Sequence, residues 1–341
     1  MAGWCPKWTL KDLLSQQNNS EERLVVKRNL NSISTFDLRR RINSFRSVDL
    51  ESASMNAVDI RLRTIMDQYH IKMNNLYLNG LLRARKNNER EDFNHVRELW
   101  YPPQEKIKIY GRLNNIGQSL FYASSNAQTA IYELRHQAGD RITVLVVRPK
   151  ENVSYFSNIV FIGLDRSSAP EVSSINKSES LKNSEEFKRG VGSKNHKKFV
   201  LIDSFLEDLL TLKIEEGEEY KYKPTVILAE ILFSIPNIDA LNYPSVATNL
   251  NGINFCTTPE KADEHFYGDE AWVIDILDVG VHPDSGKILY KTKFIKRSKS
   301  IDSDGKIEWL KEGDGINYPA ISAFTGGIKA LDKEPVSSSR K

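Results

Sequence analysis

Three polar side chains stand in apolar or turn-like surroundings, and their types could do chemistry together. They are Arg112 in YGRLN, Glu133 in TAIYELR and Ser245 in NYPS. A guanidinium binds anions through paired hydrogen bonds, a carboxylate stabilises positive charge, and a hydroxyl donates a hydrogen bond. Each also has a plain structural interpretation: a surface strand residue, a solvated helix residue, and a turn residue after Pro244.

Two strands and a helix are predicted to position the first two side chains. KIKIYGR alternates apolar and polar residues like a half-buried strand, and SLFYAS is a second short strand. Asn126 is placed to cap the helix AQTAIYELRHQ, whose apolar residues form one stripe. At about 100° per residue, Glu133 lies roughly 110° from the centre of that stripe. We therefore expect its carboxylate at the edge of the buried face, where a cleft could reach it.

The rest of the chain predicts strands and helices in irregular order. Ser204 and Glu207 form a capping box for the helix FLEDLLTL, and Pro224 opens the helix TVILAEILF, which Pro236 closes. RITVLVVRP and INFC are predicted strands, WVIDILDVGV and KILYKTKFI flank HPDSG as a hairpin, and SDG leads into KIEWL. This order favours an α+β fold over a doubly wound sheet.

We divide the chain into an N-terminal helical region, 1–75, a main domain, 76–310, and a C-terminal tail, 311–341. The helical region is either a docking or oligomerisation unit or a layer packed on the main domain. The Ser- and Lys-rich stretch from Asp165 to Lys198 predicts an exposed loop or insertion. Within residues 1–75, apolar residues recur at helical spacing and predict one buried stripe: Val58, Leu62, Ile65, Met66, Tyr69 and Met73.

Composition excludes several classes of protein. The chain has 341 residues, of which 40% are hydrophobic and 27% charged, as in soluble globular proteins. Its apolar runs are too short to span a bilayer and its N-terminus lacks the design of a secretory signal, so we expect a cytoplasmic protein with no membrane partner. The net charge is only +3 and no long basic face stands out, which argues against nucleic acid as a ligand. Cys5 and Cys256 are too few for a disulfide framework or a cysteine zinc site.

Common catalytic motifs are missing from the sequence. It contains no HExxH, CxxC, GxxxxGK[ST] or GxSxG, and no GxGxxG that opens a helix after a strand. The six histidines are scattered through unlike contexts. We therefore expect no bound metal and no P-loop or α/β-hydrolase chemistry.

Two blocks of sequence resemble the RES domain family. GRLNNIGQSLFYASSNAQTAIYELR is similar to its first signature, and ILAEILFSIPNIDALNYPSVATNLNGINFCTTPEKADEHF to its second. The Arg, Glu and Ser for which the family is named fall on Arg112, Glu133 and Ser245. LLRAR resembles the opening strand of longer members, with Arg83 as its arginine. The resemblance covers about residues 78 to 275. NNI replaces a turn that is often proline-rich, and residues 1–75 have no counterpart in short members.

The resemblance implies an enzyme that consumes NAD, with a fold similar to ADP-ribosyltransferases. Short members are toxins that deplete NAD by hydrolysis or phosphorolysis and are paired with an Xre-type antitoxin. NAD would be the substrate, and no further cofactor is expected. The partner type that this implies is an antitoxin or immunity protein. A homo-oligomer of the chain is a further candidate assembly.

The resemblance also assigns roles within the site. Glu133 would stabilise the oxocarbenium-like transition state of nicotinamide release, as carboxylates do in glycoside cleavage. Arg112 and Arg83 would bind phosphate. Tyr122 would cover the nicotinamide or its ribose, with plain core packing as the equal alternative. Ser245 would hydrogen-bond the ribose or the carboxamide, and Asn254 is a secondary candidate for binding NAD.

Two other functions compete with NAD hydrolysis or phosphorolysis. A mono-ADP-ribosyltransferase would use the same residues to modify a protein, but many enzymes that modify arginine carry a second glutamate two positions before the catalytic one. Ile131 stands there in this chain. A non-catalytic nucleotide-binding module is the other alternative, and the joint presence of Arg112, Glu133 and Ser245 argues against it.

Overall fold

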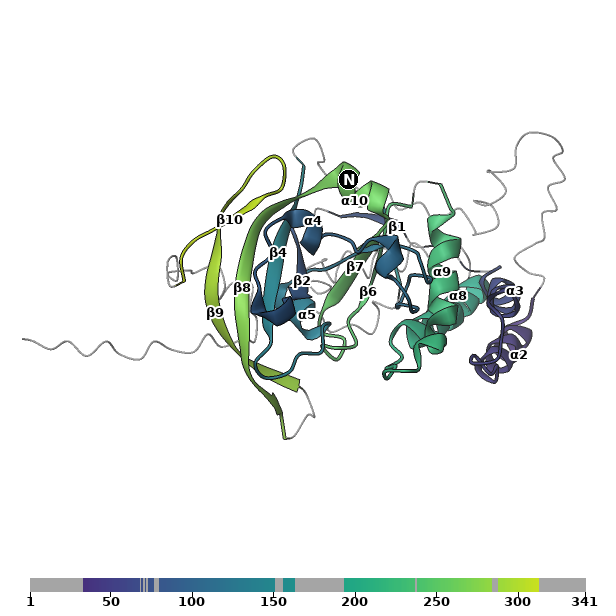
Figure 1. Ribbon diagram of the computed structural model, residues 1–341. Coiled ribbons are helices and arrows are strands. Elements are labelled where there is room, and N and C mark those ends of the chain that lie inside the picture. The colour runs from purple at the N-terminus through teal and green to yellow at the C-terminus, as the bar shows by residue number, and fades with distance from the viewer. Residues whose placement is uncertain are drawn as a thin grey trace, which may run out of the picture.

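The protein forms a mixed α+β structure around a single twisted sheet (Figure 1). The computed structural model describes residues 33–67, 69, 71, 73–76, 80–150, 156–162, 193–236, 238–283 and 288–312. The α+β class predicted from the order of the elements is confirmed. None of the helices in these ranges is long and apolar enough to cross a membrane.

Within the described residues, ten strands make up the sheet, in the order β1-β5-β6-β7-β3-β2-β4-β8-β9-β10. All neighbours are antiparallel except the parallel pair β5 and β6. The strands are β1 (Met73–Leu76), β2 (Leu81–Lys86), β3 (Phe121–Ser124), β4 (Arg141–Pro149), β5 (Phe156–Phe161), β6 (Ala240–Pro244), β7 (Ile253–Thr257), β8 (Phe266–Val281), β9 (Ile288–Ile301) and β10 (Ile307–Trp309). The predicted hairpin is confirmed as β8 and β9, the long pair at the left of Figure 1.

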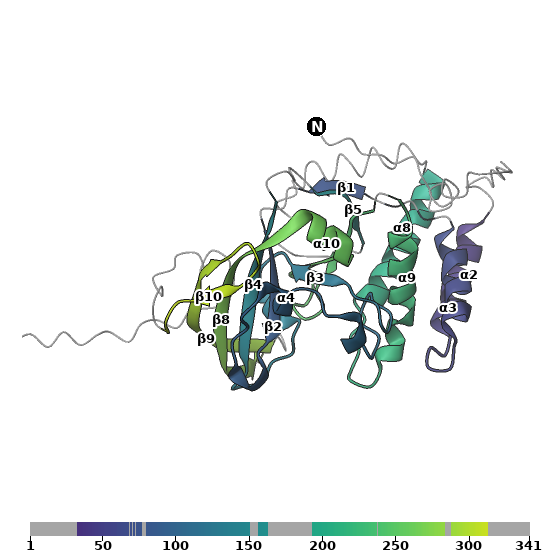
Figure 2. The same cartoon turned by 45° about the horizontal axis from the view of Figure 1, so that its top comes forward.

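Helices cover both faces of the sheet (Figure 2). The described α-helices are α2 (Thr35–Arg46), α3 (Met55–Met66), α4 (Val96–Leu99), α5 (Ala127–Tyr132), α8 (Ser193–Leu210), α9 (Lys223–Phe233) and α10 (Pro259–His265). Short 3-10 turns are η1 (Asn88–Arg90), η2 (Gln104–Lys106) and η4 (Glu219–Tyr222). Pro224 lies in the first turn of α9, as predicted.

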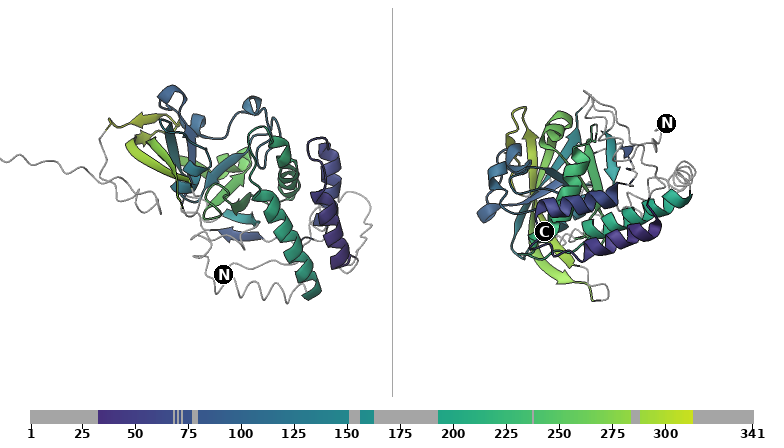
Figure 3. Two further views of the ribbon diagram at one scale, coloured as in Figure 1. Left: turned by 90° about the horizontal axis from the view of Figure 1, so that it is seen from below. Right: turned by 90° about the vertical axis from the view of Figure 1, so that its right-hand side faces the viewer.

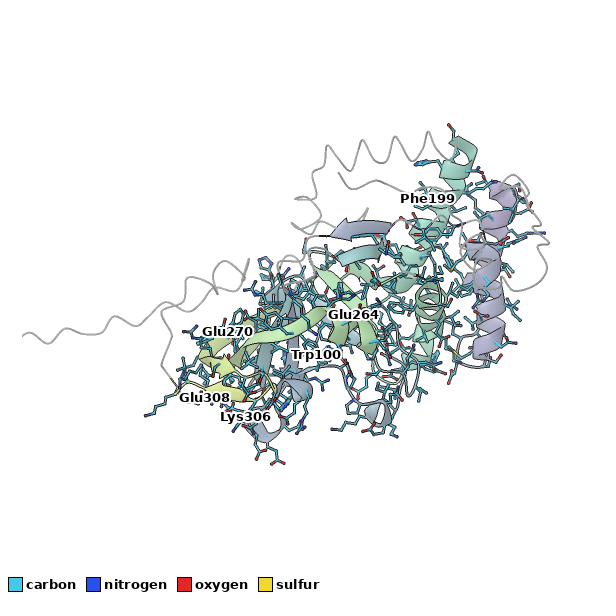
Figure 4. All side chains as sticks on the ribbon, turned by 90° about the horizontal axis from the view of Figure 1, so that it is seen from above. Trp100, Phe199, Glu264, Glu270, Lys306 and Glu308 are labelled. Atoms are coloured by element: carbon cyan, nitrogen blue, oxygen red, sulfur yellow. The ribbon has the colours of Figure 1, made fainter. Side chains whose placement is uncertain are left out.

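Strand alternation assigns the helices to the two faces. Tyr122 and Cys256 point into the core that holds α2, α3, α8 and α9, whereas their neighbours Phe121 and Phe255 point into the core beneath α4 and α10. Helix α5 lies on the same face as α8 and α9, because it packs on Leu82 and other residues of β2, β4 and β8. Figure 4 shows Phe199 of α8 and Trp100, which belong to the two opposite cores.

The sheet opens between β2 and β3. These strands share one residue pair, Leu82 with Ser124, whereas β2 pairs with β4 along its whole length from Leu81 to Lys86. Strand β3 pairs with β7 from Phe121 to Ser124. The opening therefore separates two well-bonded halves of the sheet, and it lies beside α5.

Helices α2 and α3 form a layer on α8 and α9 (Figure 3). Phe45 of α2 packs edge-on against Phe205 of α8, with ring centroids 5.4 Å apart. Four residues of the predicted apolar stripe are wholly or almost wholly buried in this core: Val58, Leu62, Ile65 and Met66. Tyr69 is buried as well, but Met73 belongs to strand β1. Residues 1–32 and 313–341 lie outside the described part of the chain.

Three local predictions are wrong, each because tertiary contacts decide the conformation. Ser204 does not begin a helix, since α8 starts at Ser193 and its buried face continues upstream through Phe199 and Ile202. KIKIYGR has an irregular backbone instead of a strand, and Ile109 within it is 59% exposed. The helix after Asn126 ends at Tyr132, because Arg135 adopts the left-handed conformation at φ 46°.

The predicted loop from Asp165 to Lys198 lies mostly outside the described residues. Its last six residues, from Ser193, already belong to α8. The predicted strands RITVLVVRP, SLFYAS and INFC are confirmed as β4, β3 and β7, and KIEWL contains β10.

Candidate functional site

A cleft of about 1450 Å³ lies on the face of the sheet that carries α5, where the sheet opens. Its walls come from α5, the turns around Tyr110, the segment between α8 and α9, the turn 246–251 and the β8–β9 hairpin. Five of the six site residues predicted from the sequence line it: Arg83, Arg112, Tyr122, Glu133 and Asn254. The two sequence blocks therefore meet at one cavity.

One oxygen of the Glu133 carboxylate is held by two hydrogen bonds, and the other has no described donor. The Ser245 hydroxyl donates to Oε1 at 2.6 Å, and the Asn254 Nδ2 group donates to the same oxygen at 2.7 Å. Oε2 accepts no hydrogen bond from any described residue, and the side chain is exposed in the cleft wall. Two donors from β6 and β7 thus fix the orientation of a carboxylate at the end of α5.

Ser245 is buried outside the cleft lining and holds Glu133 through a hydrogen bond. The residue is 0% exposed, its N–H donates to the Gly252 carbonyl at 2.8 Å, and it directly follows Pro244 at the end of β6. The hydroxyl also accepts from the Thr248 N–H at 3.3 Å. The expected contact of this hydroxyl with ribose or carboxamide is therefore replaced by a contact with the Glu133 carboxylate.

Asn254 and Gly252, from the second sequence block, both contact residues of the first block. The Asn254 Oδ1 atom accepts from the Ser124 hydroxyl at 3.0 Å, which turns the Nδ2 group toward Glu133. A Cβ at Gly252 would lie 1.9 Å from the Thr129 Oγ1 atom of α5. Only glycine leaves room for this close approach of the helix, and the approach brings Glu133 to its two donors.

Tyr122 anchors the turn that carries Arg112. Its hydroxyl donates to Asn114 Oδ1 at 2.9 Å and accepts from the Leu113 N–H at 3.1 Å. Burial raises the pKa of the Tyr122 phenol well above its usual range, so the phenol stays protonated. A Cβ at Gly111 would lie 2.1 Å from Asn114 Oδ1, which explains the glycine in this turn. The polar end of Tyr122 thus serves the turn, while its ring lines the cleft.

Arg112 binds the main chain at the end of α8. Its NH1 group donates to the Leu210 carbonyl at 2.5 Å and to the Leu212 carbonyl at 3.2 Å. The guanidinium carbon lies 5.2 Å from the centre of the Tyr222 ring, a cation–π contact. No described carboxylate forms an ion pair with it.

Arg83 donates its hydrogen bonds to main-chain carbonyls where the sheet opens. Its Nε group donates to the carbonyls of Leu99 and Trp100 at 2.8 and 3.0 Å, and its NH1 group donates to the Tyr122 carbonyl. Burial, and then the neighbouring charge of Arg85, lowers the pKa of Arg83 to about 9, so the group stays charged at neutral pH. This arginine bridges β2, β3 and the end of α4, which leaves NH2 as its one group without a described partner.

Sequence reasoning missed several cleft residues. Arg135 is the last residue of TAIYELR and lines the cleft. Its backbone is left-handed, which a prediction of a continuous helix cannot show. Tyr132 and Tyr290 form an edge-on aromatic pair at the hairpin end of the cleft, with centroids 4.7 Å apart. Tyr290 comes from β9, more than 150 residues away in sequence, so no local pattern could have found it.

Fold and site together define a mixed α+β protein with one fixed carboxylate in a cleft at an opening of its sheet. Compared with known proteins, the chain matches no protein-family model and no curated protein. The resemblance to the RES domain family accordingly rests on the quoted residues, and the contacts around Glu133 are independent of it.

Proposed function

We propose that this protein cleaves the bond between nicotinamide and ribose in NAD, as a hydrolase or phosphorylase. The observation that carries the proposal is the cleft-lining Glu133 carboxylate, one oxygen of which is held by Ser245 and Asn254 while the other has no described donor. These three residues belong to the two sequence blocks that resemble the RES family. A catalytic site built from both blocks requires that these residues lie in contact, as they do.

The chemistry needs electrostatic stabilisation and positioning more than strong acids or bases. The bond breaks with its electron pair passing to nicotinamide, which leaves as a neutral molecule, and positive charge develops on the ribose. A fixed carboxylate beside that carbon stabilises the charge without having to reorganise. Water or phosphate then adds to the carbon, with loss of a proton, to give ADP-ribose or its 1″-phosphate. The cleft exceeds the usual 300 to 1,000 Å³ of small-ligand pockets, which suits a dinucleotide.

The proposal extends to the fold and to the biological role. A mostly antiparallel sheet with the motif residues gathered at one cleft supports an ADP-ribosyltransferase-like core. An enzyme that consumes NAD without replacing it would act as a toxin or NAD-depleting effector. A neutralising antitoxin or immunity protein belongs to the same proposal.

The direct test is incubation of the purified chain with NAD, with products resolved in the presence and absence of phosphate. Free nicotinamide should appear together with ADP-ribose, or with ADP-ribose 1″-phosphate when phosphate is supplied. The Glu133→Gln variant is the control for contaminating activity. Absence of nicotinamide release by a folded wild-type protein would refute the proposal.

A further inference from the structure

Two arginines that line the cleft bind the same segment of chain. Arg112 donates to the carbonyls of Leu210 and Leu212, and Arg135 donates through NH2 to the Ile214 carbonyl at 2.6 Å. Each guanidinium thus uses one terminal nitrogen on the main chain. For the Nε group and the other terminal nitrogen of each, no described residue accepts a hydrogen bond.

The carbonyls that bind the two guanidiniums lie close together in the chain. Leu212 and Ile214 are two residues apart, a length of chain that spans at most about 7 Å. Arg135 also follows Glu133 by two residues, so its backbone starts beside the carboxylate proposed for catalysis. Its φ of 46° is a left-handed conformation that costs a residue other than glycine roughly 1 kcal/mol or more. Arg135 has this backbone conformation and also forms the hydrogen bond to the Ile214 carbonyl.

Acidic residues in the same wall do not neutralise the pair. Glu215 forms its ion pair with Lys213 at 2.9 Å, and Lys213 first, with Arg135 as a smaller contributor, lowers the pKa of Glu215. Glu219 accepts from the Gly217 N–H at 3.0 Å. Among the described residues, neither cleft arginine has a carboxylate within ion-pair distance. Four glutamates also line the cleft, but neither guanidinium is ion-paired with one of them, so both can bind an anionic group of a ligand.

We propose that Arg135 is a second substrate-binding residue, which with Arg112 forms a clamp for the diphosphate of a dinucleotide. Naming NAD as that dinucleotide rests on the proposed function, whereas the clamp itself rests on the two guanidiniums. The main-chain anchors hold both side chains in place before ligand arrives, which reduces the entropy lost on binding. The remaining N–H groups can then form charge-assisted hydrogen bonds with phosphate oxygens.

The test measures binding of ADP-ribose and of adenosine by calorimetry, which requires no turnover. Arg135→Gln should weaken ADP-ribose binding by about 10-fold or more and leave adenosine binding unchanged, because only ADP-ribose carries the diphosphate. Lys213→Gln is the matched control, since it removes one positive charge from the same cleft. Arg135→Lys should restore part of the affinity. Melting temperatures of all variants verify that they are folded.

Several outcomes would overturn the clamp. These are wild-type protein that does not bind ADP-ribose, unchanged binding in a folded Arg135→Gln variant, or an equal loss in Lys213→Gln. The failure of the clamp and that of the proposed function are distinguishable. NAD cleavage with an unchanged KM in Arg135→Gln would reject the clamp alone. ADP-ribose binding that depends on Arg135, in a protein that does not cleave NAD, would reject the function alone.

Discussion

At the scale of single residues, the structure separates the group proposed to act on substrate from the groups that hold it. Glu133→Gln preserves size and shape but removes the charge that would stabilise the cationic transition state. We expect NAD turnover to fall by about 100-fold or more with the fold intact. Glu216→Gln, a change at another glutamate of the cleft, is the matched control and should retain activity. Near wild-type turnover by folded Glu133→Gln would remove Glu133 from the mechanism.

Ser245 should act only through Glu133, because its hydroxyl is buried and donates to that carboxylate. Ser245→Ala removes one of two donors, so kcat should fall by about 10-fold while KM changes little. The decisive measurement is the double variant Ser245→Ala with Glu133→Gln. It should be no slower than Glu133→Gln alone, since the positioned charge is already gone. A further 10-fold loss in the double variant would show that Ser245 acts on the substrate independently.

At the scale of elements, the sequence predicts what local patterns determine and misses what distant contacts determine. The strands RITVLVVRP and INFC, the Asn126 cap and the proline start of α9 all follow from local chemistry and are confirmed. The early end of α5 and the irregular backbone of KIKIYGR go with distant partners such as Ile214 and Leu210, which no local window contains. Arg112, Glu133 and Ser245 could be selected from sequence, but the burial of Ser245 could not.

The contact between α5 and the turn before β7 gives a prediction about this element. In Gly252→Ala the new methyl group would lie 1.9 Å from Thr129 Oγ1, so the helix must shift. We expect a loss of about 1–3 kcal/mol in the free energy of unfolding, measured by denaturant titration, together with reduced NAD turnover. Gly280→Ala, which has nothing within 4 Å of its new Cβ, is the control. Thr129→Ala in the Gly252→Ala background should restore part of the stability, and no recovery would argue against this clash.

At the scale of the whole molecule, the N-terminal helices are part of the core and not an appendage. Phe45 of α2 packs on Phe205 of α8, and Lys223 at the start of α9 donates to the carbonyls of Leu50, Glu51 and Ala53. Deletion of residues 1–75 would expose this face of α8 and α9, and would also remove β1 from the sheet edge. We expect the truncated protein to aggregate, as judged by size-exclusion chromatography. Deletion of residues 1–32 alone leaves α2 and α3 in place and serves as the control. A monodisperse, active chain that begins at residue 76 would show that the main domain is independent.

For the proposed enzyme, the surroundings of Glu133 also bear on what accepts the ADP-ribosyl group, because many enzymes that modify arginine carry a second glutamate two positions before the catalytic one. Two residues before Glu133 stands Ile131, which is 0% exposed in the core beneath α5 and cannot engage an acceptor. We therefore expect NAD labelled in its adenylate part to yield free ADP-ribose or its 1″-phosphate, with little label on protein. The measurement is gel autoradiography of the enzyme mixed with cell lysate, beside chromatography of the small products. Stoichiometric label on one protein, lost in the Glu133→Gln variant, would instead establish a transferase.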